Sequence, residues 1–285
     1  NTLNSVKNYI DNSSGGGGLN INRTVIFAEA LGVKESESAS NNTSILQGIF
    51  EANKNLGATV VLPCGKIKVT NLNLPNTISL IGSGRHWLGT HLIGTTAGKM
   101  LNVYKHYNGD MMGSISNMVI NGKGGSTTGI FINSGMAFFK ISDMCFFSCT
   151  DFMVETKGAL IFHVTDCRVG GGMNGFKIRA GDAFFANLIT FTNVQFGSLA
   201  GRATDINGGS QIIFNSCDWE NNGTIGDMST GNILASGLSA LGEGVDLTFN
   251  NCWSEVTYGG YWLNMQGTSG VTVFRDTMVW QPQST

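Results

Sequence analysis

The 285-residue sequence has few charged side chains. Only 13% of its residues are Asp, Glu, Lys or Arg, and the net charge is −2; the charged fraction is about half of the usual share. A chain with so little positive charge is a poor match for nucleic acid or an anionic membrane surface, so we expect neither as a partner. The low charge also suits an oligomer that hides part of its surface.

Proline and long apolar runs are also scarce. The sequence has three prolines and no apolar run of about 18 residues, so no membrane-spanning segment is predicted. It has 40 glycines, roughly twice the average share, and abundant Asn, Ser and Thr. This composition is typical of an all-β protein with many tight turns.

The six cysteines show no spacing typical of a metal site. None belongs to a CxxC pair, and Cys145 and Cys149 lack a further pair of His or Cys residues to complete a ligand set. We therefore expect no metal site. An even number of cysteines permits disulfides, but the positions of several, described below, favour buried free thiols.

The first residues differ from the rest of the chain. The sequence begins without methionine, shows no basic-then-apolar signal pattern, and contains "SSGGGG" at 13–18, a composition typical of a flexible joint. We expect residues 1–24 to be a flexible segment from a longer chain, and residues 25–285 to form one domain.

A repeat of about 25 residues runs through that domain. Seven segments share an Asn, Asp or Ser, with an apolar residue two positions before it and mostly apolar or small residues one and three positions after it. These anchor residues are Asn117, Asp143, Asp166, Asn193, Ser216, Asn251 and Asp276. Because a single strand presents one face at every second residue, the inward phase reverses at each anchor.

We interpret each anchor as a bend between two short strands. Asn, Asp and Ser bond nearby backbone, and Asn and Asp tolerate left-handed backbone geometry. Stacked on successive turns, they would form a ladder of side-chain hydrogen bonds. Cys167, Cys217 and Cys252 follow their anchors at an inward position, where Cys acts as a small apolar side chain; this predicts buried thiols and assembly in a reducing compartment.

A third strand follows in most turns and is usually bracketed by glycine, as in "GFKIRAG" at 175–181. Three short strands per turn, over about seven or more turns, predict a parallel β-helix with coils over about 58–281. The alternative is a β-sandwich, but the columns stay in phase over all repeats, and Asn-Gly turns do not separate neighbouring strands.

Before the first coil lies one predicted helix, at about 43–56. Asn42 or Thr43 can cap its start, Ile45, Leu46, Ile49 and Phe50 form its apolar face, and Gly57 ends it. A β-helix has an end with unpaired strand edges, and an amphipathic helix is a natural cap for it.

The segment from 41 to 84 resembles the opening of the pectate-lyase-like superfamily found in bacteriophage tailspikes. It has the polar-capped helix, then "LPCGKI" at 62–67, then "LIGSG" at 80–84, although the family's "Asp-Asp-Thr" before the helix is "NNT" here. The later phrases "FNSCDWE" and "FNNCWSE" are also similar to tailspike coils. The resemblance covers about residues 25–280.

The resemblance implies a right-handed β-helix, a homotrimer without an obligatory cofactor, and binding or cleavage of a bacterial capsule or lipopolysaccharide O-antigen. It also implies a place in the virion tail after assembly in the host cytoplasm, joined to other tail proteins through a region before residue 1. The Asp cluster and Arg-x-Pro-x-x-Arg phrase of calcium pectate lyases are missing, as is the Asn-Thr-Asp series of polygalacturonases, so pectin is not the expected substrate.

Candidate site residues lie in the outward columns two and four positions after the anchors. The candidates on these turns are Arg168, Gln195, Asp218, Glu220, Trp253, Glu255 and Trp280. Carboxylates beside aromatic rings are typical of a sugar site, because rings stack on the apolar faces of sugars. Tyr258 is a further substrate-binding candidate, and Asp246, from the long step between two anchors, is a further catalytic candidate.

Adjacent parallel strands lie ~4.8 Å apart, so the Glu220 and Glu255 carboxyls are expected about 5–7 Å apart. Retaining glycosidases need roughly 5–5.5 Å and inverting ones roughly 6.5–9.5 Å, the range that suits the more distant pair Asp218 and Glu255. Repulsion should raise one pKa, which would make that group the general acid. Alternatively, these glutamates hold the next turn through backbone N–H groups.

Three functions stay open from the sequence. The first is a hydrolase that uses paired carboxylates drawn from Asp218, Glu220, Glu255 and Asp246. The second is a lyase that eliminates across a uronic acid. The third is a non-catalytic receptor-binding spike.

Overall fold

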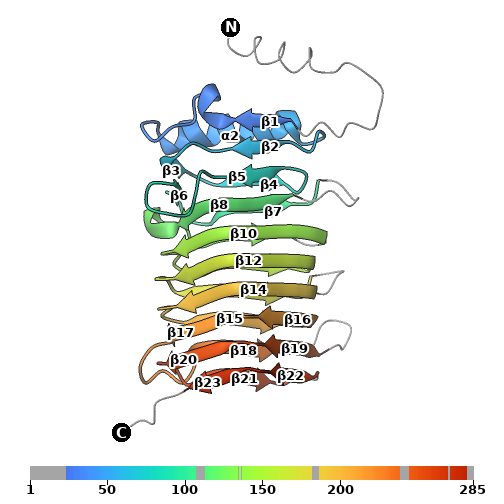
Figure 1. Ribbon diagram of the computed structural model, residues 1–285. Helices are drawn as coiled ribbons and strands as arrows, with labels where there is room; N and C mark the ends of the chain where they lie inside the picture. The colour runs from blue at the N-terminus through green and yellow to red at the C-terminus, as the bar shows by residue number, and fades with distance from the viewer. Residues whose placement is uncertain are drawn as a thin grey trace.

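The computed structural model describes residues 24–106, 113–133, 135, 137–181, 186–237, 244–268 and 270–280. They form a right-handed parallel β-helix of about seven turns, stacked from α2 at one end to β23 at the other (Figure 1). The predicted fold class is confirmed. The flexible segment was expected over residues 1–24, of which residues 1–23 lie outside the described residues.

Three strand rows wrap the core. The first face contains β1 (Val25–Phe27), β2 (Thr59–Val61), β5 (Ser79–Ile81), β16 (Gly209–Asn215), β19 (Val245–Asn250) and β22 (Thr272–Arg275). The second face contains β3 (Gly65–Val69), β6 (Thr90–Gly94), β17 (Asp218–Asn222), β20 (Trp253–Thr257) and β23 (Met278–Trp280). Strands that continue through the bend belong to both: β8 (Ser114–Asn121), β10 (Ala137–Phe147), β12 (Leu160–Gly170) and β14 (Asn187–Gly197).

The third face is a separate sheet. It contains β4 (Leu72–Pro75), β7 (Lys99–Tyr104), β9 (Thr128–Ile132), β11 (Phe152–Lys157), β13 (Asn174–Arg179), β15 (Arg202–Asn207), β18 (Gly231–Ser236) and β21 (Tyr261–Gln266). The third strands seen in the sequence are confirmed here. The sequence pattern missed β15, which belongs to the same row.

The bends between the first and second faces lie at the predicted anchors. All seven anchor residues have φ between 48° and 57°, the left-handed region. The side-chain ladder forms in part: Asn193 Nδ2 donates to Asp166 Oδ1 at 2.6 Å, and Asn251 Nδ2 donates to Ser216 Oγ at 3.3 Å. The reversal of the inward phase is therefore a backbone bend, as the alternation of apolar residues indicated.

Aromatic rings stack along the core from turn to turn. Phe214 lies between Phe191 and Phe249, with ring centroids 4.9 Å and 5.1 Å away, nearly parallel to both. Phe196 stacks on Trp219 at 5.6 Å. Since strand partners repeat at ~4.8 Å, rings at one inward position stack face to face, and this fixes the register of neighbouring turns.

The N-terminal end of the core is covered by α2 (Ala39–Asn53), as predicted (Figure 1). The helix begins four residues before the predicted start, because Ser38 caps it by accepting a hydrogen bond from Asn41 N. Asn42 is instead buried and bonds to the backbone of Lys34 and Lys68. No helix in the described part of the chain is long and apolar enough to cross a membrane.

The cysteines are free thiols, and four of them are buried: Cys149, Cys167, Cys217 and Cys252. Burial raises the pKa of both Cys149 and Cys167 to about 12. The predicted burial of Cys167, Cys217 and Cys252 is confirmed, whereas Cys64 is exposed and Cys145 is half-buried on the second face.

Candidate functional site

The outward columns of the second face have the predicted register. In one column, Arg168, Gln195, Asp218 and Trp253 are successive Cα partners. In the next column, Gly197, Glu220, Glu255 and Trp280 are successive Cα partners. We call this surface the acidic face. The β-helix thus brings three carboxylates together on two neighbouring strands, β17 and β20.

Asp218 has the most perturbed environment of the three carboxylates. Its side chain is half-buried, and Oδ1 is buried with no hydrogen-bond partner among the described residues. Oδ2 accepts a long hydrogen bond from Gln195 Nε2 at 3.5 Å. Partial burial, together with the charges of Glu220 and Glu255, raises the pKa of Asp218 despite that bond. A carboxyl group that holds its proton to higher pH is suited to act as an acid.

Glu220 and Glu255 lie directly beside each other on β17 and β20, with strands ~4.8 Å apart. Both side chains are half-buried. Within the described residues, neither carboxylate bonds to a backbone N–H of the next turn, so the scaffold role considered from the sequence has no contact to support it there.

Exposed aromatic rings flank the carboxylates. Trp253, Tyr258 and Trp280 expose 44%, 45% and 50% of their surface. Tyr258 also lines a hollow of about 330 Å³ with Leu199, Ser198, Ala200, Asn221 and Gly223. Asn221 directly follows Glu220 in β17, so the hollow borders the acidic face. Flat rings at such a border are suited to stack on sugar rings.

Asp246 does not lie with the other carboxylates. It belongs to β19 on the first face, five residues before the bend at Asn251, which is about 16 Å of extended strand. Its Oδ1 accepts a hydrogen bond from Val271 N at 2.8 Å, an interaction that holds the next turn. Arg168 is exposed two strands away from Asp218, beyond Gln195.

A loop between β5 and β6 brings residues to the bend before the second face that the sequence did not suggest as site residues. The Arg85 guanidinium donates to the Asp166 carbonyl at the bend before the second face. Trp87 in this loop is 80% exposed. The only sequence signal was a polar interruption, "GSGRHWLG", between two strand patterns.

Among the described residues, no group of three or more His, Cys, Asp or Glu side chains is placed to hold a metal ion.

Comparison with protein-family models and with curated proteins gave no match. Solved structures do match. The tailspike protein gp49 from the Acinetobacter baumannii bacteriophage Fri1, a capsular polysaccharide depolymerase, has a TM-score of 0.53 at 14% identity, over 92% of this chain and 64% of its own. ORF18 of Geobacillus virus E2 has a TM-score of 0.49 at 11% identity, over 97% of this chain and 64% of its own.

A third match is the catalytic unit of the GH87 α-1,3-glucanase from Streptomyces thermodiastaticus, with a TM-score of 0.48 at 12% identity, over 94% of this chain and 70% of its own. The chain thus spans about two thirds of the length of the matched tailspike. At these identities the likeness concerns the fold alone. The chain has the right-handed parallel β-helix fold that phage tailspike proteins also have, as the sequence resemblance implied.

Proposed function

We propose that this protein binds a bacterial surface polysaccharide, a capsule or an O-antigen, and hydrolyses its glycosidic bonds. The observation that supports hydrolysis most is the placement of Asp218, Glu220 and Glu255 on two adjacent strands, where the pKa of Asp218 is raised. The β-helix shared with a capsular polysaccharide depolymerase supports the class of substrate.

In this proposal Asp218 is the general acid. Its proton goes to the glycosidic oxygen as the bond to the anomeric carbon breaks, and the raised pKa of Asp218 favours the protonated form that a general acid needs. The exposed ring of Trp253, the Cα partner of Asp218, would stack on a neighbouring sugar. Gln195 orients the carboxyl through Oδ2.

Glu255 is the proposed base. It lies one strand away from Asp218 and two residues along, a diagonal of about 8 Å between Cα atoms. Inversion needs carboxyl groups roughly 6.5–9.5 Å apart, so this spacing of the two Cα positions is compatible with it; the second carboxylate then takes a proton from a water molecule that attacks the anomeric carbon. Glu220 lies two residues from Asp218 on β17 and directly beside Glu255 on β20, and its negative charge helps to raise the pKa of Asp218.

The test is a reducing-end assay on purified capsule and O-antigen with Asp218→Asn, Glu220→Gln and Glu255→Gln. Loss of product from Asp218→Asn and Glu255→Gln, with unchanged circular dichroism, supports the proposal. Full activity in all three variants contradicts it. A product with the ultraviolet absorbance of an unsaturated uronate would establish the lyase alternative, and tight binding without any fall in viscosity would establish the non-catalytic spike.

We also propose that the active form is a homotrimer in the virion tail, assembled in the host cytoplasm and joined to other tail proteins. The low charge content supports an assembled form. Light scattering of the purified protein measures the oligomeric state, and a monomeric mass that retains full activity would contradict the trimer.

A further inference from the structure

The hollow beside the acidic face lies on a second row of left-handed bends. Ser198 and Asn221, which both line it, have φ of 58° and 54°. They directly follow Gly197 and Glu220, which are Cα partners on β14 and β17. The hollow therefore begins one residue beyond the column that contains Glu220 and Glu255.

A buried amide fixes the backbone around this hollow. Asn222 is fully buried, and its Oδ1 accepts a hydrogen bond from Leu199 N at 3.2 Å. Its carbonyl accepts a hydrogen bond from Tyr258 N at 2.8 Å, and its Nδ2 donates to Phe196 O at 3.0 Å. Asn222 thus joins three successive turns at the point where two of the lining residues, Leu199 and Tyr258, leave the backbone. Such a hollow is formed before a ligand binds, as is usual for small-molecule sites.

The polar groups of the hollow are available to a ligand. Within the described part of the chain, the Asn221 amide and the Ser198 hydroxyl form no hydrogen bond. The ring of Tyr258 is 45% exposed. An amide and a hydroxyl group both donate and accept hydrogen bonds, and the aromatic ring offers a flat apolar surface. This combination matches a sugar ring, which has hydroxyl groups around its edge and C–H groups on its faces.

The charges around the hollow disfavour an anionic ligand. Its described lining contains no charged side chain. The charged residues near the lining in the chain are the carboxylates Glu220, Glu255 and Asp227, and Arg202, which pairs with Asp205 at 2.7 Å. A carboxylate or phosphate group in the hollow would therefore have no cation in the lining to bind, and Glu220 and Glu255 would repel it.

We infer that the hollow is a binding subsite for one uncharged sugar unit of the polysaccharide, with its ring on Tyr258 and its hydroxyl groups on the Asn221 amide and the Ser198 hydroxyl. The volume of about 330 Å³ is near the lower end of the range of small-molecule sites, roughly 300–1,000 Å³, and suits a single unit. The inference rests on the proposed function and deepens it, because it places a neutral unit next to the bond that Asp218 and Glu255 are proposed to cleave.

The test is a ligand-observed NMR titration of the full chain with three oligomers of equal length, made of glucose, N-acetylglucosamine and galacturonate. At least one of the two neutral oligomers should bind. The galacturonate oligomer should bind at least about tenfold more weakly than that neutral oligomer. Equal or tighter binding of the galacturonate oligomer, or no binding of either neutral oligomer, overturns the inference.

Two variants localise the binding to the hollow. Tyr258→Ala should weaken binding of the neutral oligomer at least about fivefold, because the stacking surface is lost. Asn221→Gly should weaken it about three- to tenfold, the size of one lost neutral hydrogen bond, while glycine keeps the left-handed bend.

Each variant has a matched control elsewhere in the chain. Phe27→Ala removes an exposed ring from β1, at the opposite end of the β-helix (Figure 1). Asn117→Gly makes the same change at a left-handed bend in β8. Both controls should bind the neutral oligomer as the natural protein does. Unchanged binding in Tyr258→Ala or in Asn221→Gly, or an equal loss in its control, overturns the inference.

The subsite and the hydrolytic site fail separately. If Asp218→Asn is inactive while Tyr258→Ala binds normally, the subsite is wrong and the hydrolytic site stands. If Tyr258→Ala and Asn221→Gly lose binding while the variants of Asp218, Glu220 and Glu255 stay fully active, the hydrolytic site is wrong and the subsite stands.

Discussion

Substitution of Asn193 tests whether the anchor residues are selected for a left-handed bend. Asn193 has a φ of 53° and donates a 2.6 Å hydrogen bond to Asp166 Oδ1. A side chain with a Cβ and no local bonding pays about 1–2 kcal/mol for this backbone conformation, and the lost hydrogen bond adds about 1 kcal/mol. Asn193→Ala should therefore lower the free energy of unfolding by about 2–3 kcal/mol.

Asn193→Gly separates the two contributions. It loses the same hydrogen bond, but glycine adopts a positive φ without the Cβ penalty. The glycine variant should be more stable than the alanine variant by about 1 kcal/mol. This order is the reverse of the usual one, since glycine inside a strand is less stable than alanine by roughly 0.5–1 kcal/mol.

Thr192 provides the matched control, because it precedes the anchor in β14 and does not have a positive φ. There, Gly should be less stable than Ala. Urea unfolding followed by circular dichroism measures the free energy of unfolding of all four variants. In thermal unfolding, a difference of 1 kcal/mol should shift the melting temperature by about 2–4 °C. If alanine is as stable as glycine at position 193, the bend does not constrain this position and the reasoning is wrong.

Three further predictions concern the core and the titrating groups. A thiol reagent at pH 8 should modify the exposed Cys64 in the native protein but reach Cys149 and Cys167 only on unfolding, because burial raises the pKa of both thiols to about 12; rapid labelling of either buried thiol would contradict the core assignment. Phe214→Ala should lower the free energy of unfolding, measured by urea titration, by about 3–5 kcal/mol, since the ring is fully buried between two stacked rings. A decrease of less than about 1 kcal/mol would contradict the ring stack. The pKa of Asp218 is raised in the fold, so the native state keeps this proton to higher pH than the unfolded chain does. The natural protein therefore loses stability as pH rises from the ordinary pKa of 3.8 through the raised one. Across that window Asp218→Asn should gain stability relative to the natural protein, and a constant difference in the free energy of unfolding from pH 3 to 8 would contradict the shift.

The bends and the register of the acidic face were predictable because they depend on local alternation. Each anchor reverses the inward phase, and a strand has a strict period of two, so the outward columns followed directly from counting. Glu220 beside Glu255 and Asp218 beside Trp253 were both correct. What the carboxylates do there stays a prediction.

The helix start was mispredicted because several polar residues in a row can cap a helix. Ser38, Asn42 and Thr43 all have suitable side chains. Asn42 is buried because it bonds to Lys68 O, a contact 26 residues away in the chain that no local pattern reveals.

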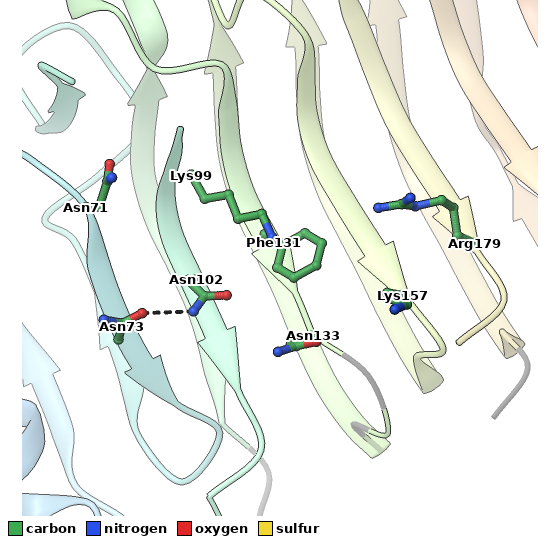
Figure 2. A pocket seen from close by; sticks show the side chains of 8 residues that line it. All are labelled: Asn71, Asn73, Lys99, Asn102, Phe131, Asn133, Lys157 and Arg179. Carbon is green, nitrogen blue, oxygen red and sulfur yellow. Dashed lines mark hydrogen bonds between the residues drawn. The ribbon is translucent and has the colours of Figure 1, made fainter. Parts of the chain in front are cut away.

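A cleft on the third face, whose lining includes Lys99, Phe131 and Arg179 (Figure 2), was missed for a similar reason. The turns before its strands vary in length, so their outward columns could not be aligned by counting. Lys99 reaches the ring of Phe131 from the neighbouring strand, and long side chains with several rotatable bonds are not placed by sequence spacing. Asp246 was grouped with the other carboxylates because it is close to the acidic turns in the sequence, but it lies on β19 of the first face, where it bonds to Val271 N.

The most direct test of the proposed function is the rate of polysaccharide cleavage by Asp218→Asn compared with Asp246→Asn. Both changes remove one carboxylate charge, and the asparagine amide that replaces the Asp246 carboxylate would still offer an oxygen to Val271 N. The account predicts a loss of roughly 100- to 10,000-fold for Asp218→Asn, the size of a lost general acid, and near-natural activity for Asp246→Asn. Full activity of Asp218→Asn, or loss of activity confined to Asp246→Asn, would contradict it.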